Sequence, residues 1–236
     1  MSLHQPIRTL FLAPTNDETT IALQAYLQST RDIMLDVCGD TNMLEHLDGY
    51  DALVVSQNIQ LTSSALDNIA DFVHCGGASL GLLHPSVDEA TQALFGVRLS
   101  RGGPQTEIRV AFADPADPLA RRMPSVWFME DQFQAMELVG DEVQPVLTTM
   151  WQYERATLAA MRTLGDGCVA CLSLQNSGDP QLQQVIYRML RAATKREEAP
   201  SLGVGVLGYG PISYAHGVSI QSVEGLEFRA VVDLNP

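Results

Sequence analysis

The chain has few basic residues, few cysteines and no long apolar run, and each shortage excludes a class of protein. Lys and Arg together number 14 against 28 Asp and Glu, which gives a formal net charge of −14 at pH 7. Such an acidic protein repels phosphate backbones and anionic lipid headgroups, so we expect neither a nucleic-acid partner nor a membrane partner. No apolar stretch approaches the ~20 residues that span a bilayer, and the amino terminus lacks the basic and apolar regions of a secretory signal.

The four cysteines include a pair, Cys168 and Cys171, with the CxxC spacing found in redox and zinc sites. The pair lies within an apolar run, residues 167–174, that is typical of a buried strand. Side chains three positions apart on a strand point to opposite faces, so the two sulfurs should diverge. No second CxxC and no nearby His pair completes a zinc site. We therefore expect free core cysteines, no metal and, given the missing signal and membrane span, a cytoplasmic protein.

Hydrophobic residues make up 46% of the chain, enough for a sizeable core. Apolar, β-rich runs predict strands at residues 7–13, 33–37, 50–56 and 78–83. Asn16 and Asp17 are predicted caps of a helix that runs to Thr30, and Thr62 caps a second helix that Gly76 and Gly77 end. The buried side of the first helix is predicted at or near Ile21, Leu23, Ala25, Tyr26 and Leu27. Strands that alternate with helices imply parallel βαβ units in a doubly wound sheet.

Beyond Arg98 the pattern changes to short strands. They are predicted at residues 106–112, 133–138, 145–151, 156–162 and 168–174, followed by a helix at 180–193. A charged segment then ends at Pro200, and we expect a linker there. The sequence therefore divides into a large domain, residues 1–196, and a carboxy-terminal segment, residues 197–236.

The carboxy-terminal segment begins with an apolar strand that runs into Gly208 and Gly210, and a helix is predicted to start near Pro211. The glycines allow a tight turn and let a diphosphate approach the backbone, while the amino terminus of the helix offers free N–H groups to that anion. Ser213 occupies the position of the third glycine in a GxGxxG pattern and is small enough for close helix–strand packing.

The next predicted strand, residues 226–232, ends at Asp233, about twenty residues past the glycines. An acidic residue there accepts hydrogen bonds from the ribose hydroxyls of adenosine and repels a 2′-phosphate, so we expect NAD rather than NADP. A glycine-rich turn alone is weak evidence, but strand, helix, strand and terminal aspartate in register predict a βαβ segment of a Rossmann NAD-binding domain.

Residues 208–216, GYGPISYAH, resemble the GxGxIxxxH signature of the glucose–fructose oxidoreductase/inositol dehydrogenase (Gfo/Idh/MocA) family. The resemblance covers only this segment. It implies NAD(P)-dependent oxidation or reduction of a sugar or cyclitol, with Gly208, Gly210, Pro211, Ile212 and Asp233 at the cofactor. The family's lysine, in a Glu-Lys-Pro motif, does not occur in this chain. Two strands and one helix form half of a mononucleotide-binding unit, so we expect no cofactor to bind this chain alone.

The large domain resembles the ThuA-like (trehalose-utilisation) domains, relatives of class I glutamine amidotransferases with a flavodoxin-like core. The matching stretches are residues 67–77, 81–84, 114–119, 130–133 and the helix at 183–192. Their order and spacing imply a three-layer αβα domain of the α/β class.

The amidotransferases hold a nucleophilic cysteine at the elbow after the fourth strand, but this elbow reads LLHPS over residues 82–86. Cys75 lies several residues earlier, at a helix end, so no glutaminase nucleophile is expected. Ser86 and His84 form a conceivable nucleophile–base pair, although residues so close in sequence seldom reach the required geometry.

A small polar pocket is the other candidate site. His84, Glu130 and Asp131, with Ser56 as a further candidate, would lie at the carboxyl ends of the strands, where open α/β sheets bind ligands. A histidine with two carboxylates serves acid–base chemistry or holds a metal. The family often has a Gly-His pair after the late strand, and residues 175–176 are Gln and Asn instead, which weakens both the hydrolase and the metal interpretation.

Three hypotheses follow. The leading one is the amino-terminal part of an NAD-dependent sugar or cyclitol oxidoreductase in which the ThuA-like domain is non-catalytic. The alternatives are a carbohydrate-binding or scaffold module, and a ThuA-type hydrolase or isomerase of sugar derivatives. An unpaired parallel edge in the carboxy-terminal segment also favours a homodimer.

Overall fold

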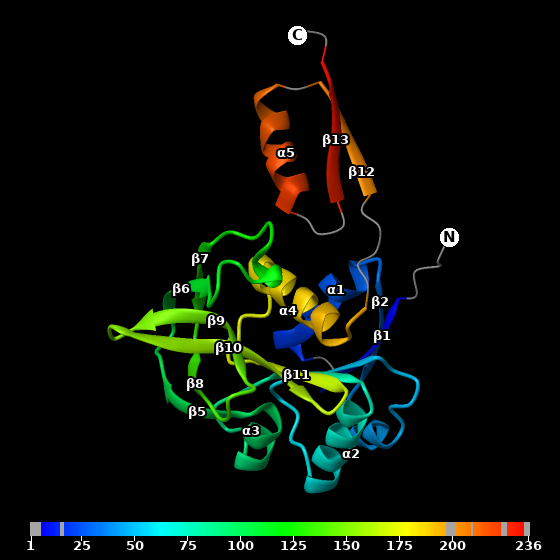
Figure 1. Cartoon of the computed structure of the whole chain (residues 1–236), viewed down its shortest axis with the longest axis vertical. Coiled ribbons are helices and arrows are strands. Elements are labelled where there is room, and N and C mark those ends of the chain that lie inside the picture. Colours follow the sequence, from blue (N-terminus) through cyan, green and yellow to red (C-terminus); the bar gives the residue numbers. More distant parts are fainter. Residues whose placement is uncertain (1–5, 15–16, 197–201, 209, 223–225, 234–236) are drawn as a thin grey trace.

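The computed structural model describes residues 6–14, 17–196, 202–208, 210–222 and 226–233. Within these ranges the strands form two separate sheets, one with eleven strands and one with two (Figure 1). The larger sheet belongs to the predicted large domain. Most of the expected linker, from residue 197 onwards, lies outside the described residues.

Half of the large sheet is parallel, as the sequence predicts. Its strands are β1 (Ile7–Leu12), β2 (Ile33–Cys38), β3 (Ala52–Val55), β4 (Ala78–Leu82) and β11 (Gly167–Leu172). They lie in the order β2-β1-β3-β4-β11, and each neighbouring pair is parallel. This is the flavodoxin-like order, in which the chain reverses direction across the sheet between β1 and β3.

Helices cover both faces of the parallel strands (Figure 1). On one face, α1 (Glu18–Ser29) and α4 (Pro180–Ala193) share a hydrophobic cluster that includes Leu23 and Ile186. On the other face, α2 (Ser63–His74) and α3 (Glu89–Phe95) share a second cluster. The predicted caps Asp17 and Thr62 are confirmed, because Asp17 accepts from the Thr19 N–H and Thr62 from the Ala65 N–H, while Asn16 lies outside the described residues. The large domain is thus a three-layer α/β fold.

The predicted buried side of α1 is partly wrong. Ile21 is 51% exposed and Ala25 is also exposed, whereas Thr20, Leu23 and Leu27 are buried. Positions 20, 23 and 27 repeat at the helical period, and Ile21 lies about 100° around the helix from Thr20. This narrow stripe of α1 is buried, and Tyr26 packs beside it against the same hydrophobic cluster.

The other half of the large sheet is antiparallel. It consists of β5 (Val97–Gly102), β6 (Thr106–Phe112), β7 (Val126–Asp131), β8 (Gln134–Leu138), β9 (Gln144–Trp151) and β10 (Glu154–Leu164). The path continues β11-β10-β9-β6-β7, while β8 pairs with both β10 and β5. Two short 3₁₀ helices, η1 (Thr41–Glu45) and η2 (Pro118–Ala120), connect neighbouring elements. The sequence analysis missed β5, β7 and α3.

The CxxC pair is part of the core, as predicted. Cys168 packs in the cluster with α1 and α4, and Cys171 packs in the cluster with α2 and α3. Burial raises the pKa of the Cys171 thiol to about 12, and its sulfur lies 3.7 Å from that of Met136. The two thiols therefore point to opposite faces of β11.

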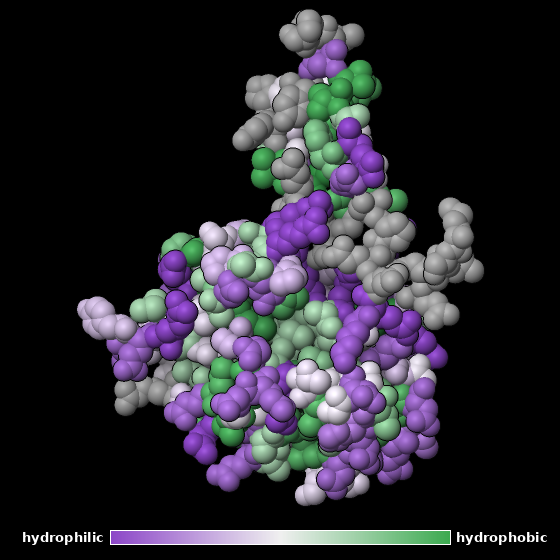
Figure 2. Space-filling model, viewed as in Figure 1, coloured by the Kyte–Doolittle hydropathy of each residue, from purple (hydrophilic) through white to green (hydrophobic). Residues whose placement is uncertain are grey.

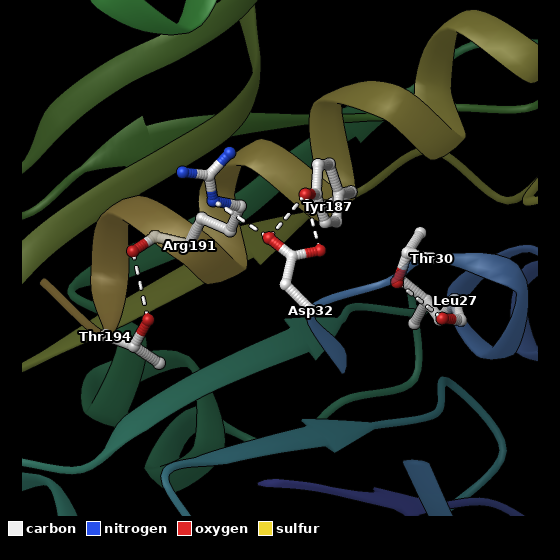
Figure 3. Close-up of polar contacts among 6 residues, drawn as sticks. All are labelled: Leu27, Thr30, Asp32, Tyr187, Arg191 and Thr194. Atoms are coloured by element: carbon white, nitrogen blue, oxygen red, sulfur yellow. Dashed lines mark hydrogen bonds and ion pairs between the residues drawn. The ribbon is translucent and has the colours of Figure 1, made fainter. Parts of the chain in front are cut away.

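A buried polar group ties α4 to the edge of the sheet where the parallel strands begin (Figure 3). Asp32, just before β2, is 3% exposed, and both of its carboxylate oxygens lie 2.7 Å from the Tyr187 hydroxyl. Arg191 Nε lies 3.5 Å from the same carboxylate. Tyr187 and Arg191 are one helical turn apart on α4. Burial, followed by the neighbouring Asp32, raises the pKa of Tyr187, so its hydroxyl remains a donor at neutral pH.

The carboxy-terminal segment forms a separate βαβ unit of β12 (Leu202–Leu207), α5 (Pro211–Ser222) and β13 (Leu226–Val232). Its two strands are parallel. Figure 2 shows apolar side chains on the surface of this unit, and Leu207 is 85% exposed. Arg122 of the large domain donates to the Leu226 carbonyl at 2.9 Å. Among the described helices, none combines the length and apolarity needed to cross a membrane.

Candidate functional site

Ser56 and His84 follow strands β3 and β4 of the parallel half, whereas Glu130 and Asp131 end β7 in the antiparallel half. Because parallel strands end at one edge of a sheet, the loops that carry Ser56, His84 and Gln175 meet at the carboxyl edge. The chain also enters α1 at this edge, through Asp17. We take this edge as the candidate site of the large domain.

Asp17 joins the β1–α1 loop to the β3–α2 loop, at the point between β1 and β3 where the strand order reverses. Ser56 donates to Asp17 Oδ2 at 2.8 Å, and Asn58 Nδ2 donates to Oδ1 at 3.1 Å. Thr19 also donates its hydroxyl to Oδ1, at 2.6 Å. The sequence analysis identified Ser56 as a pocket residue and Asp17 only as a cap, and it missed Asn58.

This network makes the stability of the large domain depend on pH. Burial raises the pKa of Asp17, but hydrogen bonds from Thr19, Ser56 and Asn58 outweigh it, so the pKa lies below the ordinary 3.8. A lowered folded-state pKa contributes stability above the unfolded-state value, and that stability is lost as the pH falls through the folded-state pKa. We expect Asp17→Ala to lower the free energy of unfolding by about 2 kcal/mol at pH 7 and by clearly less near pH 3.

Urea unfolding at both pH values measures this difference. Asp40→Ala is the matched control, because Asp40 caps η1 through one hydrogen bond on an exposed loop and should cost less than about 1 kcal/mol. An Asp17→Ala cost that is equal at pH 7 and pH 3 would show that the carboxylate charge is irrelevant.

His84 and Ser86 are in direct contact, contrary to the expectation that residues so close in sequence would not meet. The Ser86 hydroxyl lies 2.8 Å from His84 Nδ1, and the Ser86 backbone N–H donates to the same nitrogen at 3.3 Å. The turn closed by Val87 N–H and the His84 carbonyl folds the serine back onto the ring. A serine hydroxyl that donates to imidazole is the first half of a nucleophile–base pair. Within the described residues, no carboxylate orients the ring through Nε2.

Asp131 stabilises a loop. Its buried carboxylate accepts backbone N–H groups from Gln132 at 2.6 Å, Gln175 at 3.0 Å and Asn176 at 3.1 Å. Burial raises the pKa of Asp131, and these backbone hydrogen bonds act in the opposite direction. The Asn176 side chain donates to the Glu130 carbonyl at 3.1 Å. Asp131 therefore fixes the β11–α4 loop at the carboxyl edge.

The predicted pocket residues His84, Glu130 and Asp131 thus lie at one edge of the sheet, but His84 is not joined to the two acidic residues. Among the described residues, no hydrogen bond or ion pair links His84 to Asp131 or to the exposed Glu130. That part of the chain also holds no group of three or more His, Cys, Asp or Glu side chains suited to a metal ion. The carboxyl edge offers polar contacts for a ligand and one serine–histidine contact.

Two cavities flank the parallel strands. One, of about 300 Å³, lies between the ends of β3 and β4 and reaches Ser86. The other, of about 590 Å³, lies at the opposite edge, where β3 and β4 begin, and is rich in carboxylates. Its acidic lining residues are Glu45, Asp48, Asp51 and Asp71, and Arg196 pairs with Asp51.

The glycine turn of the carboxy-terminal unit has defined geometry. Gly208 has φ +80°, a conformation that favours glycine, and its N–H donates to the Val232 carbonyl at 2.7 Å. Ser213 closes the turn, donating its N–H to the Gly210 carbonyl at 2.9 Å and its hydroxyl to the Gly208 carbonyl at 2.6 Å. Asp233 directly follows β13. The side chains of residues 211 and 212 lie outside the description.

Comparison with known proteins identifies the fold of the large domain. The chain matches no protein-family model and no curated protein. A protein described as ThuA-like from Bacteroides uniformis is similar over 81% of this chain and 93% of that one, with a TM-score of 0.63 and 11% identity. A cytoplasmic protein from Salmonella typhimurium is similar over 79% of this chain and 98% of that one, with a TM-score of 0.60 and 14% identity.

The same fold also occurs within larger enzymes. A β-galactosidase from Bacillus circulans sp. alkalophilus is similar over 81% of this chain but only 31% of that chain, with a TM-score of 0.62 and 8% identity. Likeness at these identities shows fold alone, and it confirms the predicted ThuA-like fold of the large domain. The Gfo/Idh/MocA segment predicted at residues 201–236 stays a prediction.

Proposed function

We propose that this chain is the amino-terminal part of an NAD-dependent oxidoreductase of sugars or cyclitols, in which a ThuA-like domain accompanies a dehydrogenase of Gfo/Idh/MocA type. The observation that carries the proposal is the parallel βαβ unit with Gly208 at φ +80° between β12 and α5. In dinucleotide-binding folds such a turn brings the diphosphate to the amino terminus of the helix.

The residues of this turn fit the cofactor. A Cβ added at Gly208 or at Gly210 would meet nothing within 4 Å, so the turn borders open space that a diphosphate can approach. Asp233, at the end of β13, is placed in sequence to accept hydrogen bonds from ribose hydroxyls and to repel a 2′-phosphate. When bound, NAD supplies the hydride acceptor. The residues of this chain would bind and orient its adenosine half.

The proposal is tested on the protein extended along the reading frame of its parent gene. We expect the extended protein to transfer hydride from a sugar or cyclitol to NAD, which is measured by the absorbance of the reduced nicotinamide. We expect residues 1–236 alone to bind NAD much more weakly. Asp233→Asn should weaken NAD binding about tenfold and reduce the preference over NADP, because a charged hydrogen-bond acceptor is lost.

Asp141→Asn, in the β8–β9 loop, is the matched control and should leave NAD affinity unchanged. Absence of NAD binding by the extended protein would overturn the proposal. Tight NAD binding by the 236-residue chain would contradict the expectation that NAD binding needs further strands of the nucleotide-binding domain.

A second candidate function, a non-enzymatic carbohydrate-binding or scaffold module, is favoured by two observations. The β-galactosidase with the same fold is about three times as long as the matched part, so the fold there is one portion of a carbohydrate-active enzyme. In addition, the Asp131 carboxylate is used to hold a loop. Titration calorimetry of the 236-residue protein with mono- and disaccharides tests this function, and no heat with any sugar would count against sugar binding.

The third hypothesis is a hydrolase or isomerase of sugar derivatives. Its support is a single contact, of 2.8 Å, between the Ser86 hydroxyl and His84 Nδ1. It needs a group that orients the imidazole, and the described residues supply none by hydrogen bond. We rank it below the other two.

A further inference from the structure

The cavity between the ends of β3 and β4 has a lining unlike that of the carboxylate-rich cavity at the opposite edge. Its polar residues carry hydroxyl or amide groups, apart from one carboxylate, and they are Ser56, Gln57, Gln60, Ser86, Asp88 and Thr91. Its apolar wall includes Val55, Ile59, Leu61, Leu83 and Phe95. From this lining we propose that the cavity binds one neutral polyol of monosaccharide size.

The balance of polar and apolar groups suits a sugar ring. Hydroxyl and amide groups both donate and accept hydrogen bonds, as sugar hydroxyls do, so the amides of Gln57 and Gln60 can pair with a ligand hydroxyl in either sense. Ser56, whose proton goes to Asp17, can offer a ligand only an acceptor. The apolar wall offers contact area for the C–H faces of the ring. Small-molecule sites are usually mostly apolar with a few convergent polar groups, and this lining has a larger polar share, which suits a ligand with many hydroxyl groups.

The charge of the lining selects neutral ligands. Asp88 is the only ionisable side chain among the lining residues, and it accepts the Thr91 N–H at 2.7 Å. No Lys, Arg or His among the described residues lines the cavity, so none of its described side chains provides the charge-assisted hydrogen bonds that hold a phosphate. Sugar phosphates and nucleotides are therefore disfavoured.

The size selects a single ring. A volume of about 300 Å³ lies at the lower end of the range for ligand cavities. One monosaccharide or cyclitol fits this space, and a disaccharide would have to extend beyond it.

Contacts outside the cavity hold its polar and apolar walls in place. Ser56 donates to Asp17 and accepts the Asn58 N–H at 3.3 Å, so its hydroxyl has a fixed orientation. Phe95 lies against β4 at Gly81, where an added Cβ would come within 2.5 Å of the ring. A preformed wall loses little conformational entropy on binding, which favours affinity.

This inference deepens the second candidate function and rests on it, because it assigns the carbohydrate to one cavity. The test is titration calorimetry of the 236-residue protein with myo-inositol, glucose, galactose, trehalose and glucose 6-phosphate. We expect heat with at least one neutral monosaccharide or cyclitol, and at least about tenfold weaker binding of trehalose and of the phosphate.

Two variants locate the site. Gln57→Ala removes one polar partner and should weaken binding about fivefold, and Ser86→Trp should fill the cavity and abolish binding. Gln28→Ala on α1 and Ser64→Ala on α2 are the matched controls, since both are exposed and neither lines the cavity. If a variant fails to fold, methyl resonances of Ile59 and Leu83 in the unsubstituted protein should shift on titration.

The outcomes separate the two claims. No heat with any sugar overturns the inference and the carbohydrate-binding form of the second function, and leaves the scaffold form. If sugar binds but Gln57→Ala and Ser86→Trp change its dissociation constant by less than twofold, the inference alone is overturned and the sugar site lies elsewhere. The same holds if sugar binding shifts the methyl resonances of neither Ile59 nor Leu83. Equal binding of glucose and glucose 6-phosphate contradicts the charge argument.

Discussion

Gly167→Ala is expected to lower the free energy of unfolding of the large domain by at least about 3 kcal/mol. Gly167 begins β11 directly against the end of α2 and the start of β4. A Cβ at this position would lie 2.1 Å from the Gly77 carbonyl oxygen and 2.2 Å from that of Val73. Both contacts are with backbone, which cannot move aside as a flexible side chain would, so a strand or a helix must shift.

Chemical unfolding in urea measures the loss, and a midpoint of thermal unfolding about 6–12 °C lower is expected for a domain of this size. Gly178→Ala is the matched control, because its nearest neighbours lie at 3.4 Å and 3.8 Å and its φ is not in the left-handed region. It should change stability by less than about 0.5 kcal/mol. A Gly167→Ala cost below about 1 kcal/mol would mean that β11 packs less tightly on α2 than the structure shows.

Most of the parallel half of the fold could be predicted because its central strands are buried on both faces. Strands β3 and β4 are buried at every position, so each appears in the sequence as a continuous apolar run. The antiparallel half was harder. In β7 an apolar residue, Phe128, is 60% exposed, so the residue types do not alternate with burial, and α3 is too short to show a helical repeat.

The residues of the candidate site could be located, but their roles could not. Parallel topology alone brings Ser56, His84 and the β11–α4 loop to one edge. The bridge from Asp17 to Asn58 joins residues 41 positions apart, and sequence spacing carries no sign of it. Asp131 was a predicted acid–base group, yet its carboxylate accepts three backbone N–H groups. Hydrogen bonds to backbone depend on the folded path of the chain and leave no pattern in residue types.

The polar features of the large domain divide between its two edges. At the carboxyl edge, Asp17 accepts a hydrogen bond from Ser56, which lines the smaller cavity, and Asp131 fixes the β11–α4 loop. At the opposite edge, the buried network of Asp32 joins β2 to α4, and α4 leads to the βαβ unit. The proposed ligand site lies at one edge, and the connection to the βαβ unit, the proposed nucleotide-binding segment, lies at the other. This arrangement is compatible with a large domain that binds while a second domain reacts.

Asp32→Ala should destabilise the large domain by about 3–5 kcal/mol, because it removes the carboxylate that faces a buried guanidinium. Asp32, Tyr187 and Arg191 are 3%, 8% and 8% exposed, so water cannot easily replace the lost partner (Figure 3). Asp71→Ala, at an exposed position on α2, is the matched control and should cost less than about 0.5 kcal/mol.

A second substitution separates the charge from the packing. Asp32→Leu combined with Arg191→Met replaces both charges by apolar groups, and it should recover most of the loss, because a buried ion pair is often no more stabilising than apolar residues of similar volume. Tyr187→Phe alone removes one hydrogen bond to a carboxylate and should cost about 1.5–3 kcal/mol. Urea unfolding of the single and double variants gives the coupling energy. An Asp32→Ala cost within about 1 kcal/mol of zero would show that Asp32 and Arg191 do not couple β2 to α4. The same conclusion would follow if the Asp32→Leu/Arg191→Met variant lost as much stability as the sum of its two single changes.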